Sequence, residues 1–409
     1  MTRFTTRAKL AIFLAIFLTG VSPILAASQC VNLFNSSARN ARIEGEAMPQ
    51  IWDLKKLEQA RDHGSPAASA LIIEAQKIIS QPALSVMNKE AVPPSGDKHD
   101  YISISLYLWP NPETKNGLPY IKRDGEPNPN LSRSHPDADN FWLTRSRIKN
   151  LSIAYKISGD ESFAIKASQL LRTWFIDPET RMNPNMKFAQ GHPGKSNGDP
   201  WGIIELAECV ELFDAIKLLE TSKNFSAQDK MELRSWFGEM LEWLRTSELG
   251  QEEGSAPNNH GTWFDAELAS MALFVGRIDI AKAILEQVGP KRISTQIAPD
   301  GSQIEELKRT RSLHYSIYNL RAFFLLARLG EKVGVDIWNY QSEDHRSLSK
   351  ALQFVIPAAT SKASWPFQQI DKLKEEDVNT LIMLANGRLI DQGVLSKERF
   401  SQSRASLIF

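Results

Sequence analysis

From residue 140 onward, apolar residues of this 409-residue chain recur three and four positions apart. This spacing predicts amphipathic helices, because it gathers the apolar side chains on one face of each helix. Short connectors at 158–160 and 275–277 indicate that consecutive helices pack as antiparallel pairs. We predict helices at 52–58, 67–79, 140–158, 161–174, 201–220, 226–248, 263–275, 278–288, 312–329 and 348–355. Many such pairs predict an all-α fold, an α/α toroid or incomplete α/α barrel. A repeat solenoid is disfavoured, because the pairs show no fixed period.

Polar and aromatic segments between the helices are expected to line a groove. Residues 101–139 are dense in Gly, Pro, Asn and Asp, yet they carry Tyr107 and Trp109. A long irregular segment that is rich in aromatic residues is typical of a functional surface. Further loops are predicted at 177–199, 250–262 and 298–310. Loops on one rim of a toroid would form an extended site for a chain-like ligand.

The first 27 residues have the layout of a secretory signal peptide. Three basic residues precede an unbroken apolar run at 10–18, and small residues at 26–28 offer a cleavage site. The run is shorter than the roughly 20 apolar residues of a membrane-spanning helix. We therefore predict export to the periplasm or beyond, with no stable membrane insertion after cleavage. The mature chain, residues 28–409, is expected to be a single domain and a monomer.

The charge balance excludes some partners and leaves the cysteines open. Removing the three basic residues of the signal leaves 45 Lys and Arg against 48 Asp and Glu. Such a chain lacks the basic footprint of a nucleic-acid-binding protein. A polyanionic ligand would therefore need a local basic groove. Cys30 and Cys209 could pair in an exported protein, or Cys209 could be a buried free thiol.

The first candidate constellation is Asn258-Asn259-His260, just before the helix predicted from Trp263. Asn is favoured as a helix cap, so either Asn could have only that role, with His260 as a surface residue. The functional interpretation is that Asn259 and His260 face a substrate.

The second constellation lies in a predicted helix, where Arg311, His314, Tyr315 and Tyr318 fall on one face. A core stripe of hydrogen-bonded Tyr and His is the structural alternative. The Arg argues against that alternative, because an unpaired buried charge is unfavourable.

These residue types suit β-elimination from a uronate. The C5 proton becomes more acidic when Asn or Arg neutralises the adjacent carboxylate, and His and Tyr can serve as base and acid. Tyr needs a nearby cation to become a useful base at neutral pH. Arg311, about two turns from Tyr318 on the same face, is predicted to lower the pKa of that tyrosine. Side-chain donors would make a metal or other cofactor unnecessary, and the sequence has no HxxH or His-rich cluster.

The chain resembles the alginate lyase superfamily in four motifs. These are Asn-Asn-His, R-x6-Y about fifty residues later, YLWPNP and TWFIDPETRMNPNMKFAQGHPG. The resemblance covers about residues 95–345 and implies an α/α toroid that acts as a polysaccharide lyase on an anionic polysaccharide. It implies that Asn259 and Arg311 neutralise the substrate carboxylate, and that His260 and Tyr318 handle the protons. The best-known mannuronate lyases have Tyr-His-Asn-Tyr where this chain has Tyr-Ser-Ile-Tyr at 315–318. The polymer is therefore open between alginate (polymannuronate) and glucuronan.

Further residues are candidates for substrate binding along the groove. Polar contacts are expected from the loop at 177–199 and sugar stacking from aromatic residues. The candidates are Asn183, Gln190, His192, Lys187, Tyr107, Trp109, Tyr315 and Trp263. Turn bonding is the structural alternative for the Asn and Gln, and core packing is the alternative for the Trp residues.

Two other functions remain possible at this stage. A glycoside hydrolase would need two flanking carboxylates, for which Asp265, Glu305 and Glu306 are available. That reading leaves the Arg, His and Tyr face without a role. A non-catalytic polysaccharide-binding protein would show no dependence on His260 or Tyr318.

Overall fold

The computed structural model describes residues 50–131, 135–385 and 405–409, all within the unit Met48–Phe409. The signal peptide predicted at 1–27 and Cys30 lie outside the described residues. Cys209 is buried and forms no disulfide with any of the described residues. Among the described residues, no helix has both the length and the apolar character that a membrane span requires.

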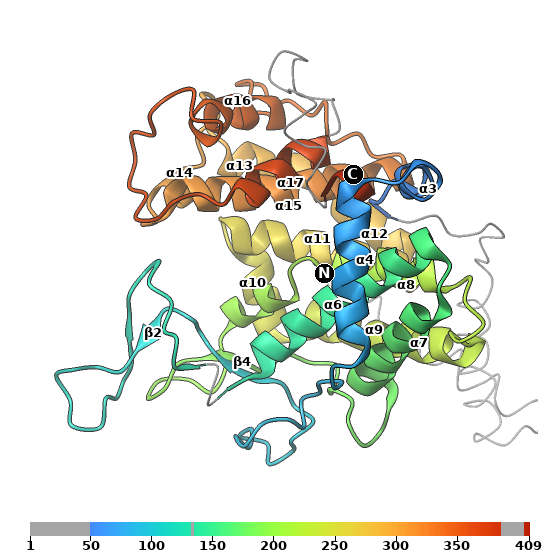
Figure 1. Cartoon of the computed structure of the whole chain (residues 1–409). Coiled ribbons are helices and arrows are strands. Elements are labelled where there is room, and N and C mark those ends of the chain that lie inside the picture. Colours follow the sequence, from blue (N-terminus) through green and yellow to red (C-terminus); the bar gives the residue numbers. More distant parts are fainter. Residues whose placement is uncertain (1–49, 132–134, 386–404) are drawn as a thin grey trace, which may run out of the picture. The chain divides into compact units, whose positions relative to one another are not determined.

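Helices make up most of the described chain (Figure 1). The longer helices are α3 (Leu54–His63), α4 (Pro66–Ile79), α6 (Asp137–Ser158), α7 (Glu161–Leu171), α8 (Cys209–Leu219), α9 (Ala227–Thr246), α10 (Glu248–Ser255), α11 (Asn259–Phe274), α12 (Ile278–Val288), α15 (Ser312–Val333), α16 (Leu348–Ala359) and α17 (Glu375–Ala385). Shorter helical segments are η1 (Arg172–Ile176), η2 (Pro200–Leu206), η3 (Gly289–Ile293), α13 (Ser294–Gln296), α14 (Ile304–Leu307) and α19 (Ala405–Ile408).

Consecutive helices pack as the expected antiparallel pairs, because local signals end one helix and start the next. Gly159 adopts φ 73°, which closes α6, and the Asp160 side chain accepts from the Ser162 N–H to start α7. The capping box of Ser226 and Asp229 starts α9. Helix α6 packs against α4, α7 and α8.

Helix α11 is the element that positions the site. It is buried on nearly every side and packs against α8, α9, α10, α12 and α15 (Figure 1). Because α11 and α15 lie side by side, the two constellations found in the sequence come together at neighbouring helices. The apolar residues of these helices belong to one continuous core.

Some predicted boundaries are wrong. The segment expected as a loop at 250–262 contains most of α10 and the start of α11, because the Ser247 side chain accepts from the Gly250 N–H and starts a new helix. The helix expected at 201–220 is divided into η2 and α8, since Glu208 adopts a left-handed backbone with φ 70°. The sequence pattern also did not predict α17, which packs on α15.

Two small sheets organise the irregular segments. Strands β1 (Ile102–Ile104) and β4 (Phe188–Gly191) pair in parallel, which joins the segment at 101–139 to the loop at 177–199. Strands β2 (Leu108–Trp109) and β3 (Ile121–Lys122) form an antiparallel hairpin. The loop after β3 reaches α15, where it contributes to the site.

Candidate active site

Asn259 is fixed at the start of α11 by a buried carboxylate. The cap of this helix is Asn258, whose side chain accepts from the His260 N–H, so Asn258 is the one of the two Asn residues that has the cap role. The Asn259 backbone N–H and side-chain Nδ2 donate to the two oxygens of Glu306, at 2.7 and 2.8 Å. Burial raises the Glu306 pKa to about 7, although the bonds from Asn259 act in the opposite direction. Asn259 Oδ1 is buried and has no partner among the described residues.

His260 pairs with a carboxylate that the sequence analysis did not identify. Its Nδ1 lies 2.8 Å from Oε1 of Glu253 on α10. Because a carboxylate accepts, this contact places the proton on Nδ1 and leaves the Nε2 lone pair available. The Trp201 indole lies edge-on to the imidazole, with ring centroids 5.0 Å apart, and its side chain is partly exposed.

Tyr318 lies at the α11–α15 interface. Its ring lies 4.8 Å from that of Trp263, which follows His260 by three residues on α11, and it stacks at 6.2 Å on His314. Burial raises the Tyr318 pKa well above its usual value; nearby Glu208 raises it further, and Arg321 opposes the shift. The hydroxyl therefore retains its proton at neutral pH.

The predicted role of Arg311 toward Tyr318 is wrong. The Arg311 Nη2 atom lies 2.6 Å from Oδ2 of Asp371, and the cation that acts on the Tyr318 pKa is Arg321. Burial alone would lower the Arg311 pKa, but the bonds to Asp371 and Tyr107 outweigh it and raise the pKa. Arg311 is the residue before the first residue of α15, and its side chain contacts Asp371 in the C-terminal segment.

A hairpin contact anchors the first turn of α15. The Tyr107 and Tyr315 hydroxyls lie 2.7 Å apart, and the Arg309 guanidinium lies 3.6 Å from the Tyr315 ring centroid. Arg309 also donates to both oxygens of Asp124, in the loop after β3. Burial would raise the Asp124 pKa, but bonds from Arg309 and Thr310 lower it to about 2. Tyr107 and Tyr315, both predicted to bind substrate, are thus brought beside Arg311.

The polar loop candidates are largely occupied by internal bonds. Asn183 Nδ2 donates to Asp97 and Asp100, which matches the turn-bonding alternative. Gln190 is buried, and its N–H donates to Ser103 Oγ. His192 Nε2 lies 2.7 Å from the Tyr120 carbonyl oxygen, and Lys187 is exposed.

The aromatic candidates differ in exposure. The Trp263 side chain is 0% exposed, so its predicted role as a sugar-stacking surface is wrong. It sits on the α15-facing side of α11 and supports Tyr318 instead. Trp109 is partly exposed, but the Arg123 guanidinium covers its ring at 4.8 Å. The exposed ring beside His260 is Trp201, which was not among the predicted site residues. Its position directly after the loop predicted at 177–199 could have indicated a place in the groove.

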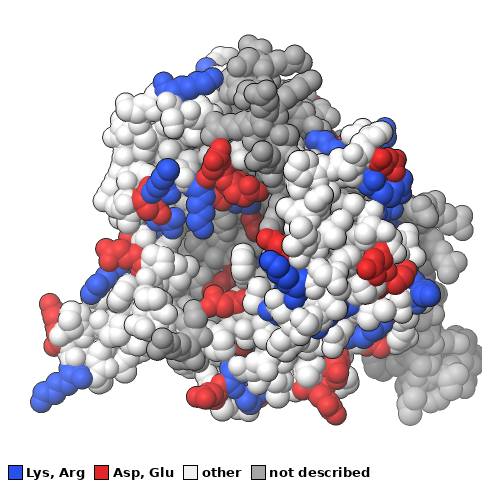
Figure 2. Space-filling model, in the orientation of Figure 1, with Lys and Arg blue, Asp and Glu red and all other residues white. Residues whose placement is uncertain are grey.

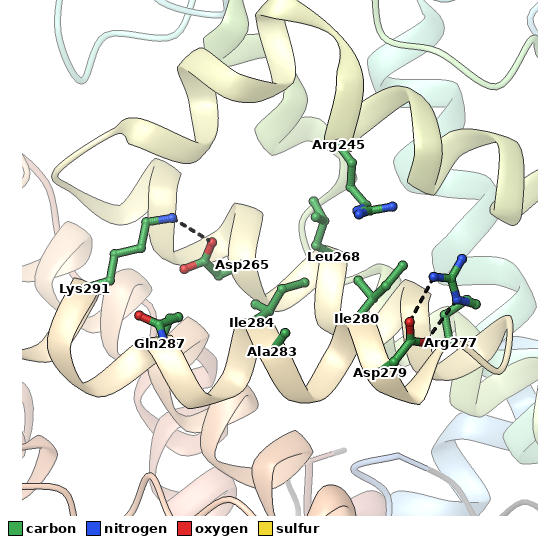
Figure 3. A pocket seen from close by; sticks show the side chains of 10 residues that line it. All are labelled: Arg245, Asp265, Leu268, Arg277, Asp279, Ile280, Ala283, Ile284, Gln287 and Lys291. Carbon is green, nitrogen blue, oxygen red and sulfur yellow. Dashed lines mark hydrogen bonds and ion pairs between the residues drawn. The ribbon is translucent and has the colours of Figure 1, made fainter. Parts of the chain in front are cut away.

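The carboxylates of the hydrolase alternative have other partners. Asp265 pairs with Arg292 at 2.7 Å and with Lys291 at 3.7 Å. Figure 3 shows Asp265 at the edge of a pocket of about 430 Å³, which none of the predicted site residues lines. Glu305 pairs with Lys308, and Glu306 holds Asn259. The three acids therefore do not form a catalytic pair.

One face of the molecule carries both signs of charge. Figure 2 shows a hollow on this face, with Lys and Arg side chains intermixed with Asp and Glu around it. Within the described ranges, no group of three or more His, Cys, Asp or Glu residues is placed to hold a metal ion.

Comparison with known proteins gives a consistent result. The family model described as alginate lyase matches residues 85–365. The crystal structure of an alginate lyase from Bacteroides ovatus has 34% sequence identity and a TM-score of 0.83, covering 88% of this chain and 98% of that one. No curated protein sequence matches this chain.

More distant structures have the same fold. Alginate lyase A1-III from Sphingomonas species A1 has 16% identity and a TM-score of 0.51, covering 84% of this chain and 96% of that one. A histidine-to-alanine variant of A1-III, complexed with a tetrasaccharide, has 16% identity and a TM-score of 0.53 with the same coverage. Because these structures are α/α toroids, the predicted fold class is confirmed.

Proposed function

Because this chain belongs to the alginate lyase family of polysaccharide lyases, we propose that it cleaves alginate by β-elimination at Asn259, His260, Arg311 and Tyr318. The proposal rests on the packing of the N-terminal part of α11 against the N-terminal part of α15. His260 opens α11, Tyr318 lies in the second turn of α15, and Trp263 joins the two helices through its contact with Tyr318. Glucuronan, the other β-1,4-linked polymer, is the second candidate.

The proton-transfer roles of His260 and Tyr318 follow from the groups that surround each side chain. Glu253 holds the Nδ1 proton of His260, so Nε2 is the base that takes the C5 proton of the uronate. Tyr318 keeps its proton at neutral pH and gives it to the leaving glycosidic oxygen. The C5–H and C4–O bonds break and a C4–C5 double bond forms. Asn259 and Arg311 stabilise the charge that builds on the substrate carboxylate.

The choice of alginate is supported by where the motif departs from that of mannuronate lyases. Ser316 and Ile317 are both about 1% exposed. The Ser316 hydroxyl donates to the Ser312 carbonyl oxygen within α15, and its own carbonyl accepts from Gln303. The two substituted positions therefore face the core, so the departure leaves the substrate side of α15 unchanged. The Bacteroides ovatus relative, at 34% identity, is itself described as an alginate lyase.

Export follows from the N-terminal pattern and completes the proposal. We infer that residues 1–27 direct the chain to the periplasm or beyond, where an anionic polysaccharide would be met. Mass spectrometry of the protein from the periplasmic fraction is expected to show a mature chain that begins near residue 28. A full-length chain in the cytoplasm would contradict this expectation.

One experiment separates the candidate functions. The mature protein is incubated with polymannuronate, polyguluronate, glucuronan and hyaluronan, and ultraviolet absorbance reports unsaturated product. Alginate substrates are expected to give the signal, and Tyr318→Phe is expected to lose it while still binding oligosaccharide. New reducing ends without absorbance would indicate a hydrolase, and full activity of Tyr318→Phe would remove that residue from the mechanism. Activity is expected to survive exhaustive chelation.

A further inference from the structure

Arg311, which the proposed reaction assigns to the substrate carboxylate, is bound to a carboxylate of the protein. Its Nη2 atom lies 2.6 Å from Oδ2 of Asp371. The Nε atom of the same guanidinium is buried and has no hydrogen-bond partner among the described residues. Asp371 therefore engages the guanidinium incompletely, whereas a free carboxylate can bind Arg through two parallel hydrogen bonds.

Asp371 is presented by a short segment, 368–371, that lies against the start of α15. Ser312 N–H donates to the Gln368 carbonyl oxygen, and Ile370 N–H donates to the Thr310 carbonyl oxygen. Gln369 Nε2 donates to the carbonyl and Oδ1 of Asp371. These bonds fix the backbone of the segment and direct the Asp371 side chain toward Arg311. The segment begins three residues after residue 365, where the match to the family model ends.

Exposure distinguishes Asp371 from Glu306 and Asp124, two other acids near the site. Glu306 is 1% exposed and holds Asn259 through two hydrogen bonds, so it is part of the core. Asp124 is anchored by both Arg309 and Thr310. The Asp371 side chain, in contrast, is 42% exposed and has a single cationic partner in the described chain. Of the three, Asp371 alone can rotate into water at little energetic loss.

We propose that Asp371 is an internal substitute for the substrate carboxylate. Asp371 holds Arg311 until a uronate carboxylate displaces it. This inference rests on the proposed lyase function and names a specificity-determining residue for that reaction. A neutral sugar has no group that replaces the carboxylate on Arg311, so it leaves the Arg311–Asp371 pair intact. A uronate replaces one carboxylate by another and releases Asp371 to solvent. Because Asp371 and the substrate compete for Arg311, a sugar needs a carboxylate to bind productively. The same competition weakens the binding of the uronate substrate.

The test is the Asp371→Asn variant, compared with wild type on the preferred polymer. Removal of the competing charge is expected to lower KM about two- to fivefold, the range of an exposed ion pair, while kcat changes less than about twofold. Asp279→Asn is the matched control. Asp279 forms a similar exposed pair with Arg277, outside the site, and its substitution makes the same change in net charge (Figure 3). Its KM is expected to equal that of wild type.

The outcomes separate this inference from the proposed function. A wild-type enzyme that forms no unsaturated product from any uronate polymer contradicts the function itself. An active wild type with an unchanged or higher KM in Asp371→Asn overturns only the role of Asp371, as does an equal fall in KM in Asp279→Asn. Damage to the site would raise KM, so the expected fall is not a structural effect.

A binding measurement covers the case in which Asp371→Asn folds poorly. Gln369 also bonds the backbone carbonyl of Asp371, so Asp371→Ala retains that anchor. Calorimetry with a uronate tetrasaccharide is done on Tyr318→Phe and on Tyr318→Phe with Asp371→Ala. The double variant is expected to bind about two- to fivefold more tightly. Equal or weaker binding overturns the proposal.

Discussion

The carboxylate of Glu253 lies 2.8 Å from Nδ1 of His260 and is almost completely shielded from solvent. Burial raises the Glu253 pKa, and the contact with His260 opposes that shift. A carboxylate in this position orients an imidazole and selects the tautomer whose Nε2 can accept a proton. The geometry makes Glu253 a positioning residue for the proposed base.

We expect Glu253→Gln to lower kcat at least about tenfold, because an amide can present either an oxygen or an N–H to Nδ1 and no longer selects the tautomer. Unsaturated-product formation across a pH series measures the effect. The neighbouring Glu252 is exposed, so Glu252→Gln is the matched control and is expected to retain activity. Equal kcat in Glu253→Gln and wild type would mean that His260 needs no orienting acid.

The two Trp residues near His260 are expected to respond differently to substitution. The Trp201 side chain is 40% exposed and offers a ring to a bound sugar. Trp201→Ala should raise KM roughly three- to tenfold and leave the unfolding temperature nearly unchanged.

Trp263 is buried under Tyr318, so Trp263→Ala should instead lower the free energy of unfolding by about 3–5 kcal/mol in urea denaturation. Trp263→Ala serves as the stability control for Trp201→Ala. An unchanged KM in Trp201→Ala would exclude Trp201 from the sugar subsite.

The stability of the protein should fall as pH rises from about 5 to 8. Burial raises the Glu267 pKa to about 8, with Arg145 acting in the opposite direction. The folded state then binds more protons than the unfolded state, whose Glu pKa is near 4.3, so the free energy of unfolding decreases with pH over this interval. One such group contributes up to about 1.4 kcal/mol per pH unit.

Glu267→Gln should flatten this dependence most clearly between pH 7 and 8, since Glu205 and Glu306 have pKa values raised by burial to about 7. Denaturant unfolding at several pH values provides the test. An unchanged slope in Glu267→Gln would show that this carboxyl does not titrate in the interval.

Gln369 caps α15 from outside the helix. The residue at the N-cap position, Arg311, makes no side-chain cap bond, and Gln369 Oε1 accepts from the Leu313 and His314 N–H groups. Gln369→Ala should therefore lower the free energy of unfolding by about 1 kcal/mol in denaturant titrations. Gln353→Ala, at an exposed position of α16, is the control and should be neutral. Equal stability of the two variants would refute the capping role.

The helices were predictable where their periodicity is local. Helix α12 has the predicted bounds, and α15 begins at the predicted Ser312. The face that carries His314, Tyr315 and Tyr318 was also predictable, because side-chain direction on a helix depends only on spacing. Arg311 precedes the first residue of α15 and pairs with Asp371 instead. The break at Glu208 was not predictable, since a positive φ in a non-Gly residue is imposed by its surroundings.

The sequence by itself determined the helical pattern, the family resemblance and the residue types available for elimination, because these depend on neighbours along the chain. Tertiary packing alone decided what each of those residues contacts. It placed Glu306 on Asn259, Asp371 on Arg311 and Arg321 near Tyr318, and it buried Trp263 while exposing Trp201. Glu253 lies only seven residues before His260, yet the sequence does not show that Glu253, and not Glu252, contacts the imidazole. Burial and proximity set these partners and their pKa values, and both arise only when distant segments pack together.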